Sequence, residues 1–427
     1  MFLAHSYKSH GWSVAIVTQR RSPREGPLVS ILTTGLITLA CSVVSTPVLA
    51  DSFQPFVRTS IDRDDNLFRR SEGESRGSDD DADTIRTIGG GTRFSIPVSR
   101  QLISGVADVA SVKFDRNRQL DYTRKDVRGD WHWFVAKHFE GHVGGRYLQE
   151  LAPFADFDSE RRNLRTDKRR YADGSWRFHS SWRWHAGYAK DDYTYDLPSQ
   201  RANARTEDAV VTGFDYLARS GSTVGLQLRR LDGAYPLRPN FGNTDLFASG
   251  YVQDEAKINV LWLATGSTQI LFLGGWVERK LKADADRAKS GTNARLIVNW
   301  TPAARAGIVV QAWREFSAID GALIDSALND GASAQLKWEF SAKIHAIADV
   351  MHEKRTFEPF DGVGAPIGLD ASSDSSRTRS VALIYKPLRS LTLKARAFQQ
   401  ERTGSIAAGT KSYKANGAAL SAILEFH

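Results

Sequence analysis

The chain has 427 residues, of which 41% are hydrophobic and 25% are charged, and its formal net charge is +8. The basic residues are spread along the chain and alternate with apolar ones. This excludes a nucleic-acid-binding protein, because that class needs clustered basic faces with aromatic platforms. Cys41 is the only cysteine, so no disulfide can form within the chain, and folding must rely on packing and hydrogen bonds.

The first 50 residues have the pattern of an export signal. Basic residues precede a mostly apolar stretch over 28–44, and compact side chains at Val48 and Ala50 fit a secretory cleavage site. The alternative is a retained transmembrane anchor, which the Ser and Thr residues in the stretch disfavour. The sequence therefore predicts a signal peptide over 1–50 and a mature domain over 51–427.

Polar and apolar residues alternate with period two through most of the mature chain, and helical spacing is hard to find. The clearest example places Asn293, Arg295 and Asn299 on one parity and Leu296 and Trp300 on the other. Charged side chains on one face and apolar ones on the opposite face suit a wall between water and lipid.

Short and long connections take turns between these segments. The eight short ones fall near 97–100, 137–139, 180–181, 220–222, 265–267, 301–304, 341–342 and 387–390. The nine long ones fall near 62–84, 115–121, 152–162, 190–207, 232–247, 280–290, 317–328, 356–377 and 402–412. Seventeen connections join eighteen strands. The predicted fold is an all-β, transmembrane, antiparallel up-and-down β-barrel of about eighteen strands. A soluble propeller or sandwich is the alternative, but no repeat of fixed period supports it.

Aromatic residues near the strand ends are expected to form girdles at the two membrane interfaces. They are Trp131, Trp133, Trp176, Trp182, Trp184, Tyr188, Trp276 and Trp300. The last segment fits the same scheme, because Leu420, Leu424 and Phe426 share one parity while Ser421 and Glu425 occupy the other.

The inward parity places a set of mainly basic residues along the lumen, where they are the candidate substrate-binding residues. They are Arg93, Arg128, Asp130, Arg177, Arg183, Arg229, Lys257, Arg295, Lys337, Lys343, Lys394 and Arg396. Guanidinium and ammonium groups supply donors without acceptors, so this lining would favour anionic or hydroxyl-rich solutes. The alternative is an ordinary polar lumen in which Asp130, Glu339, Asp349 and Glu425 neutralise much of the charge.

Other motifs point to no chemistry. The acidic run over 79–83 suits a divalent cation only weakly, because it lacks the ligand spacing of a calcium site, and a solvated loop is the favoured interpretation. Gly89, Gly90 and Gly91 lie inside a strand pattern with no helix after them, so close backbone packing or a strand kink is expected there. The chain contains no hydrolase or zinc-binding motif. We therefore expect no enzyme activity, no catalytic residue, no metal and no cofactor.

A short motif follows the first predicted strand of the mature chain and resembles a signature of the EpsL-like outer-membrane proteins of exopolysaccharide operons, a group of β-barrel porins. The matching residues are Asp64, Asp65, Asn66, Leu67, Phe68 and Arg69. The resemblance implies a role in secreting or assembling extracellular polysaccharide, with no catalytic residue to carry over. Asp64 and Asn66 are alternatively interpreted as organising the loop through side-chain to backbone hydrogen bonds.

Three functions remain open from the sequence. The first is passive passage of exopolysaccharide through a polar lumen, the second is a diffusion porin for small anions or sugars, and the third is a surface receptor or adhesin using the loops at 62–84 and 356–377. The expected location is the outer membrane of a Gram-negative bacterium. The expected partners are outer-membrane lipid and lipopolysaccharide, the barrel-assembly machinery and, through the resemblance, polysaccharide and other proteins of an export operon.

Overall fold

The computed structural model describes residues 52–71, 81–155, 160–238, 249–282, 288–318, 324–359, 372–405 and 408–426. The predicted signal peptide lies outside the described residues. The strands are β1 (Phe53–Asp64), β2 (Asp83–Val98), β3 (Gln101–Phe114), β4 (Tyr122–Val135), β5 (Phe139–Leu151), β6 (Leu164–His179), β7 (Trp182–Tyr195), β8 (Arg205–Leu217), β9 (Thr223–Ala234), β10 (Gly250–Thr265), β11 (Thr268–Leu281), β12 (Ala288–Ala303), β13 (Ala306–Ala318), β14 (Ile324–Glu339), β15 (Ile344–Pro359), β16 (Ser373–Tyr385), β17 (Leu391–Thr403) and β18 (Tyr413–Glu425).

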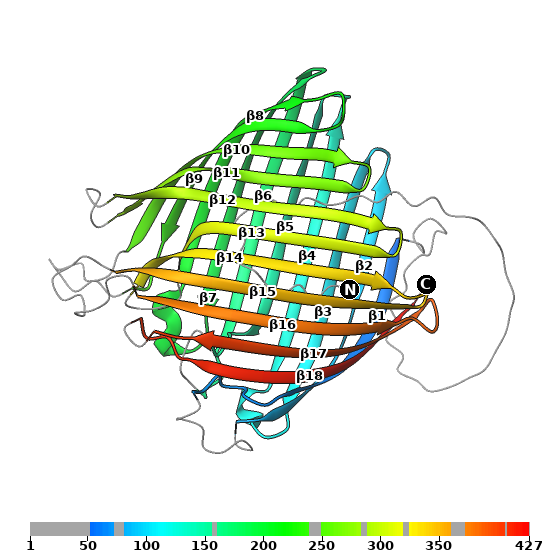
Figure 1. Ribbon diagram of the computed structural model, residues 1–427, viewed down its shortest axis with the longest axis vertical. Coiled ribbons are helices and arrows are strands. Elements are labelled where there is room, and N and C mark those ends of the chain that lie inside the picture. The colour runs from blue at the N-terminus through cyan, green and yellow to red at the C-terminus, as the bar shows by residue number, and fades with distance from the viewer. Residues whose placement is uncertain are drawn as a thin grey trace, which may run out of the picture. The chain divides into compact units, whose positions relative to one another are not determined.

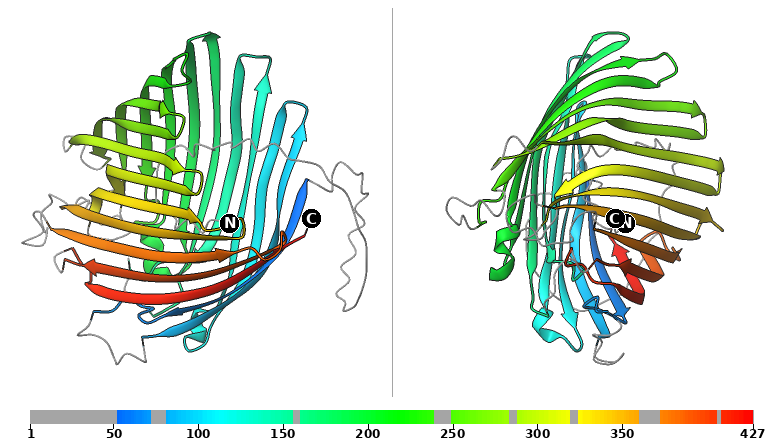
Figure 2. Two further views of the ribbon diagram at one scale, coloured as in Figure 1. Left: turned by 45° about the vertical axis from the view of Figure 1, so that its right-hand side comes forward. Right: turned by 60° about the vertical axis from the view of Figure 1, so that its left-hand side comes forward.

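The eighteen strands form one closed antiparallel ring. Each strand pairs with its neighbours in the sequence, and β1 closes the ring by pairing with β18, from Phe56 opposite Glu425 to Asp64 opposite Gly417. Strands β12–β18 run across β3–β6 on the opposite wall (Figure 1), as the tilt of strands in a closed barrel requires. The turned views show β18 beside β1 (Figure 2). The predicted fold class and strand number are confirmed.

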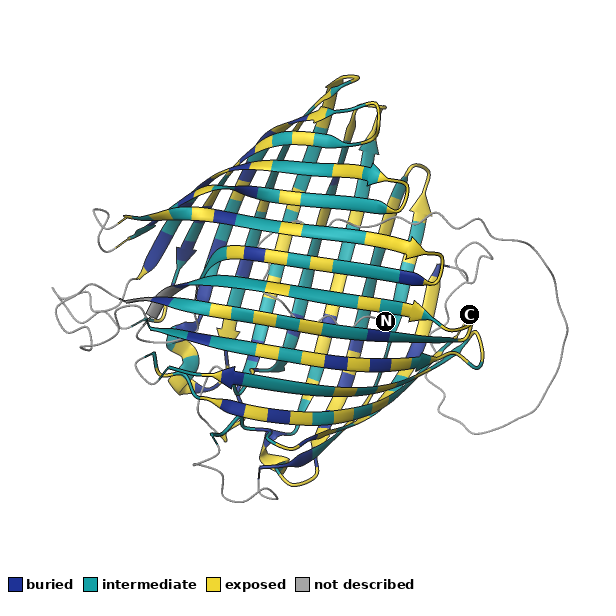
Figure 3. Cartoon of the chain, viewed as in Figure 1, coloured by how far each residue is buried: buried dark blue, intermediate teal, exposed yellow. Residues whose placement is uncertain are grey.

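The apolar parity faces outward. Leu296, Trp338 and Leu393 are 38%, 44% and 37% exposed, so they do not form a dry interior. Exposed and more buried residues alternate along the strands (Figure 3). Because a closed ring leaves no unpaired strand edge, this apolar exterior can lie in hydrocarbon without exposing backbone polar groups.

The aromatic girdle is clearest at the ends of the strands that meet the short turns. Trp131, Trp176, Trp182, Trp184 and Trp300 are exposed there, and Trp133 is partly buried. Tyr188 lies near the middle of β7, so its placement at a strand end was wrong, and Trp276 lies nearer a long connection. The last strand follows its predicted parity. Leu420, Leu424 and Phe426 are exposed, and Glu425 forms an ion pair with Arg93 on β2.

The inner face is marked by side chains that reach over a whole strand to the next one. The Tyr171 hydroxyl on β6 donates to Asp130 on β4 at 2.7 Å, and the intervening position on β5 is Gly144. A Cβ at Gly144 would lie 2.5 Å from the Tyr171 oxygen. The small residue therefore permits the bridge, because the concave side of the ring brings alternate strands within reach.

The glycine run of β2 serves the same purpose. The Arg58 guanidinium on β1 donates two hydrogen bonds to Asp108 on β3, both of 2.8 Å. Gly89 is the β2 partner of Arg58, and Gly91 is the β2 partner of Asp108. The predicted close packing at this run is confirmed.

Helical structure is confined, in the described residues, to the short 3-10 helices η1 (Arg118–Leu120) and η2 (Pro198–Asn203). In this part of the chain no helix is both long and apolar enough to span a membrane.

Candidate functional site: the lumen wall and its outer mouth

The inner face of β4–β12, called here the paired wall, carries basic residues that are matched by acids. Asp215 on β8 accepts hydrogen bonds from Arg183 at 3.0 and 2.8 Å, and it lies 3.0 Å from His185. The Asn259 amide on β10 donates to the same carboxylate at 3.1 Å, across Gly225 on β9. Asp215 is thus a hub that joins three strands.

Similar pairs continue around the ring. Glu255 on β10 contacts Arg229 at 2.9 Å and Lys257 at 2.7 Å, and Arg295 on β12 makes hydrogen bonds of 2.9 and 2.7 Å with Glu315. These charges are fixed by their neighbours, which leaves them little attraction for a passing solute.

Seven of the eleven predicted basic residues form ion pairs within the described part of the chain. Arg93 pairs with Glu425, Arg128 with Asp126 at 3.6 Å, Arg183 with Asp215, Arg229 and Lys257 with Glu255, Arg295 with Glu315, and Lys337 with Glu339 at 2.7 Å. The neutralising roles predicted for Glu339 and Glu425 are therefore confirmed. Asp130 and Asp349 instead accept hydrogen bonds from neutral partners: Tyr171 for the first, and Gln335 and Ser380 for the second.

Two predicted wall residues lie at the short-turn end of the barrel. Lys343 is in the turn between β14 and β15, where its ammonium donates to the Pro387 carbonyl at 3.1 Å, so its assignment to a strand was wrong. Arg177 lies beside an irregularity in the pairing of β6 with β7. Alternation in the sequence did not predict where these two strand ends depart from regular pairing.

The inner face of β16–β18 and β1, called here the open wall, holds the remaining two. Lys394 and Arg396 lie on β17, and within the described residues neither forms an ion pair or a side-chain hydrogen bond. Lys394 is opposite Ser421 on β18, and Ser421 is opposite Ser60 on β1. In the neighbouring row, Arg396 is separated from Asp62 on β1 by one small residue of β18. This part of the wall combines two cations outside any ion pair with hydroxyl groups and the carboxylate of Asp62, and Asp349 on β15 lies close enough to act on Lys394. The Arg396 guanidinium also lies 5.6 Å from the centre of the Phe398 ring.

Sequence reasoning missed an imidazole cluster on the paired wall. The rings of His132 and His142 stack at 4.3 Å, and His142 Nδ1 lies 3.2 Å from Asp173. The sequence held a usable signal, because His132 and His142 are equally distant from Lys137 in the β4–β5 turn and are therefore cross-strand partners. Among the described residues, no group of acidic, His or Cys side chains has the geometry of a metal site.

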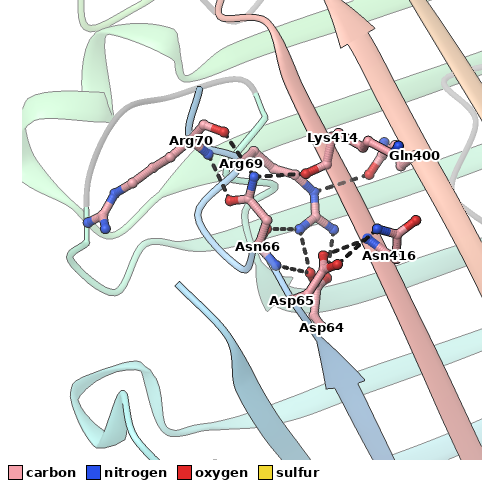
Figure 4. Close-up of polar contacts among 8 residues, drawn as sticks. All are labelled: Asp64, Asp65, Asn66, Arg69, Arg70, Gln400, Lys414 and Asn416. Carbon is pink, nitrogen blue, oxygen red and sulfur yellow. Dashed lines mark hydrogen bonds and ion pairs between the residues drawn. The ribbon is translucent and has the colours of Figure 1, made fainter. Parts of the chain in front are cut away.

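The Asp64–Arg69 motif forms a latch at the seam where β1 meets β18 (Figure 4). Arg69 donates to both carboxylate oxygens of Asp64, at 2.9 and 2.8 Å, and to Gln400 on β17 at 3.1 Å. Its backbone has φ 57°, a left-handed conformation that is unusual for a residue with a side chain. The surrounding hydrogen bonds hold this strained turn in place.

The rest of the latch ties the turn to the last strand. The Asn66 amide donates to the carbonyls of Arg70 and Lys414, both at 2.9 Å, and its N–H donates to Asp64 at 3.0 Å. Asp65 accepts from the backbone and side chain of Asn416 at 2.6 and 2.9 Å. The expected loop-organising role of Asp64 and Asn66 is confirmed.

The acidic run after the latch is only partly described. Asp79 and Asp80 lie outside the described residues, whereas Asp81 and Asp83 are buried. Asp81 pairs with Arg70, and Asp83 accepts hydrogen bonds from the backbone at 115–117. A solvated loop was the wrong interpretation for these two residues, because protein donors surround both carboxylates.

Two long connections turn inward at the outer mouth. Leu67, which follows β1, packs with Val112, Phe114 and Leu120 on the inner side of β3 and η1. Phe68 meets Phe154 of the β5–β6 connection at 5.0 Å, edge to face. Arg402 on β17 donates to the Ala155 carbonyl at 2.5 Å, so the same connection also reaches the open wall. Together these segments cover one sector of the mouth.

The closed ring, its apolar exterior and its polar inner face define an outer-membrane β-barrel of a Gram-negative bacterium. Similar solved structures include the outer membrane protein OpdK of Pseudomonas aeruginosa (11% identity, 88% of this chain and 100% of that chain, TM-score 0.45), OccK2 (OpdF) of the same organism (12%, 88% and 98%, 0.47) and Acinetobacter baumannii OccAB3 (11%, 88% and 98%, 0.45). No family model and no curated protein matches the chain.

Proposed function

We propose that the protein is a passive diffusion channel for small anionic solutes. The observation that carries this proposal is the pair Lys394 and Arg396 on β17, which lie on the lumen parity and form no ion pair within the described residues. Asp349 and Asp62 act on them electrostatically, but only from beyond ion-pair distance. A cation about 4 Å from an anion contributes roughly 1 kcal/mol even in a water-like dielectric, enough to raise the local anion concentration severalfold.

The inward connections at the mouth support a small solute. The segments at 65–71 and 152–155 occupy the inner side of one sector of the opening and are held there by Arg402 and the apolar contacts of Leu67. A bulky polymer would have to displace these contacts, whereas a small ion passes beside them.

Ion selectivity of the purified protein in planar bilayers tests the proposal. Under a KCl gradient the reversal potential should show a preference for chloride, with an open conductance that rises with salt. The variant K394Q/R396Q should lose part of that preference. Lys354 is an exposed basic residue of the outward parity on β15, so K354Q is the matched control and should behave like the unmodified protein. A preference for cations, or no current without a partner protein, would refute the proposal.

Exopolysaccharide export is the function that the motif resemblance implies, and it stays a prediction. The matching residues form the latch that joins the β1–β18 seam. Closing the ring requires such contacts whatever the barrel transports, so the motif does not support export in particular. Accumulation of polymer in the periplasm of a deletion strain would favour export over diffusion. The receptor hypothesis also stays a prediction, since parts of the loops it relies on, at 72–80 and 360–371, lie outside the described residues.

A further inference from the structure

A groove of about 700 Å³ lies on the membrane-facing side of β13–β17. Its floor is made of small outward residues, Ala334, Ala348 and Ala397, and its sides are formed by Leu336 and Val381. The inward residues between them contribute only to the backbone floor, because successive side chains of a strand point to opposite faces. The lining is therefore mainly apolar and open to hydrocarbon.

The end of the groove toward the long connections is polar. Arg379 and Gln399 line this end, and the Arg379 guanidinium donates to the Gln399 carbonyl oxygen at 3.1 Å. Gln399 in turn donates to Asn416 at 3.2 Å, and Asn416 donates to Asp65. This chain of hydrogen bonds fixes the direction of the Arg379 side chain and leaves its other N–H groups available.

More basic residues lie beside this end of the groove. Arg377 and Lys414 are exposed, and both face outward one step further along their strands. Arg63 on β1 is exposed on the same side. The nearby acids are Glu401, which lies between Arg377 and Lys414 in register, and Asp65, which is engaged by Asn416. Four basic groups thus face two acidic ones, and the excess charge is positive.

We propose that this surface is a binding site for a lipid with a phosphorylated headgroup. An acyl chain would lie on the alanine floor, and the phosphate would be held by Arg379 and Arg377. A guanidinium fork matches phosphate oxygens with paired hydrogen bonds, which a hydrated ammonium does less well. The apolar groove faces the bilayer and the charges lie at its headgroup end, so one molecule that is anionic at one end and apolar at the other satisfies both. The site is independent of what passes through the lumen.

Native mass spectrometry of the full barrel, freed of bound lipid in detergent, tests the site. The probe is a hexa-acylated lipid A that carries two phosphates. We expect one tight adduct, and R377Q/R379Q should weaken it by about tenfold through the loss of charge-assisted hydrogen bonds. A348L and A397L should also weaken it, by filling the groove with no change in charge. R170Q, at an exposed outward position on β6, is the matched control and should bind normally.

Two further probes separate the sources of the signal. Inorganic phosphate at the same concentration should not displace the lipid, and phosphatidylcholine should bind more weakly than lipid A. Displacement by inorganic phosphate, equal binding of phosphatidylcholine, or unchanged binding by both sets of variants would overturn the proposal. The charge variants and the groove variants are independent, so one that failed to fold would leave the other to decide.

Discussion

The paired wall and the open wall are built from the same residue types but use them differently. On the paired wall Arg183 is held by Asp215, and Arg229 and Lys257 by Glu255. On the open wall Lys394 and Arg396 form no ion pair within the described residues, and Asp349 and Asp62 act on them only from a greater distance. A basic side chain in this lumen is therefore either held in an ion pair or left outside one, and its neighbours decide which.

The largest expected effect comes from the hub of the paired wall. Asp215 is 2% exposed, and its carboxylate contacts Arg183, His185 and Asn259. D215A would leave the partly buried Arg183 guanidinium with only Glu140, at 3.9 Å, as an acidic neighbour and would remove the acceptor of Asn259, so we expect a loss on the order of 3 kcal/mol in the free energy of unfolding. Urea denaturation in micelles, followed by the loss of heat-resistant mobility on gels, measures the change. Stability equal to that of the unmodified protein would mean that the pairs of this wall contribute nothing to folding.

The Asp64–Arg69 ion pair of the latch gives a second test of whether ion pairs stabilise the barrel, here at the rim rather than in the wall. The side chains of Asp64 and Arg69 are 10% and 14% exposed. D64A removes both carboxylate contacts of Arg69 and leaves its left-handed turn less well held, so we expect a loss of about 2 kcal/mol in stability. D64N keeps the shape but not the charge and should lose less. Equal losses for the two variants would show that the ion pair itself is unimportant.

The sequence predicted which face of each strand meets the lumen, but it did not predict which lumen residues form pairs. Alternation in segments such as 293–300 was enough to predict the strands, the ring and the outward side of Leu296, because lipid and water impose one parity on a whole strand. Partners were harder to predict. Asn259 reaches Asp215 over an intervening strand, which depends on the register of three strands and on Gly225 between them.

The latch could be predicted in part from the sequence. Asp64 and Asn66 are residues that commonly stabilise turns, so their local role was predictable. The contacts of Asn66 with Lys414 and of Arg69 with Gln400 were not predictable, because the partners are more than three hundred positions away and meet the motif only when the ring closes.

Reversing the charge of the open wall should affect transport and leave folding intact. K394E/R396E replaces two available cations with anions, so we expect the preference for chloride to become a preference for potassium in the bilayer measurement. The unfolding free energy should fall by only about 1 kcal/mol, because no ion pair is lost and the new carboxylates meet Asp62 and Asp349 only beyond ion-pair distance. A large fall in stability, with selectivity unchanged, would place Lys394 and Arg396 with the supports rather than with the channel.

The smallest expected effect on stability and ion selectivity comes from removing the acidic partner of a single basic residue, Arg93. Arg93 and Glu425 are about equally exposed, at 28% and 27% of their side chains, and the Arg93 guanidinium also lies 4.6 Å from the centre of the Phe56 ring. E425Q keeps the shape of the partner but removes its charge, so the net charge of this part of the lumen becomes more positive by one. The cost in stability should be below about 1 kcal/mol, since pairs open to water contribute little. The preference for anions should rise slightly, and R93Q/E425Q should cancel the rise. If E425Q leaves the reversal potential unchanged while K394Q/R396Q shifts it, then position along the lumen, and not the absence of an acidic partner, makes a basic residue selective.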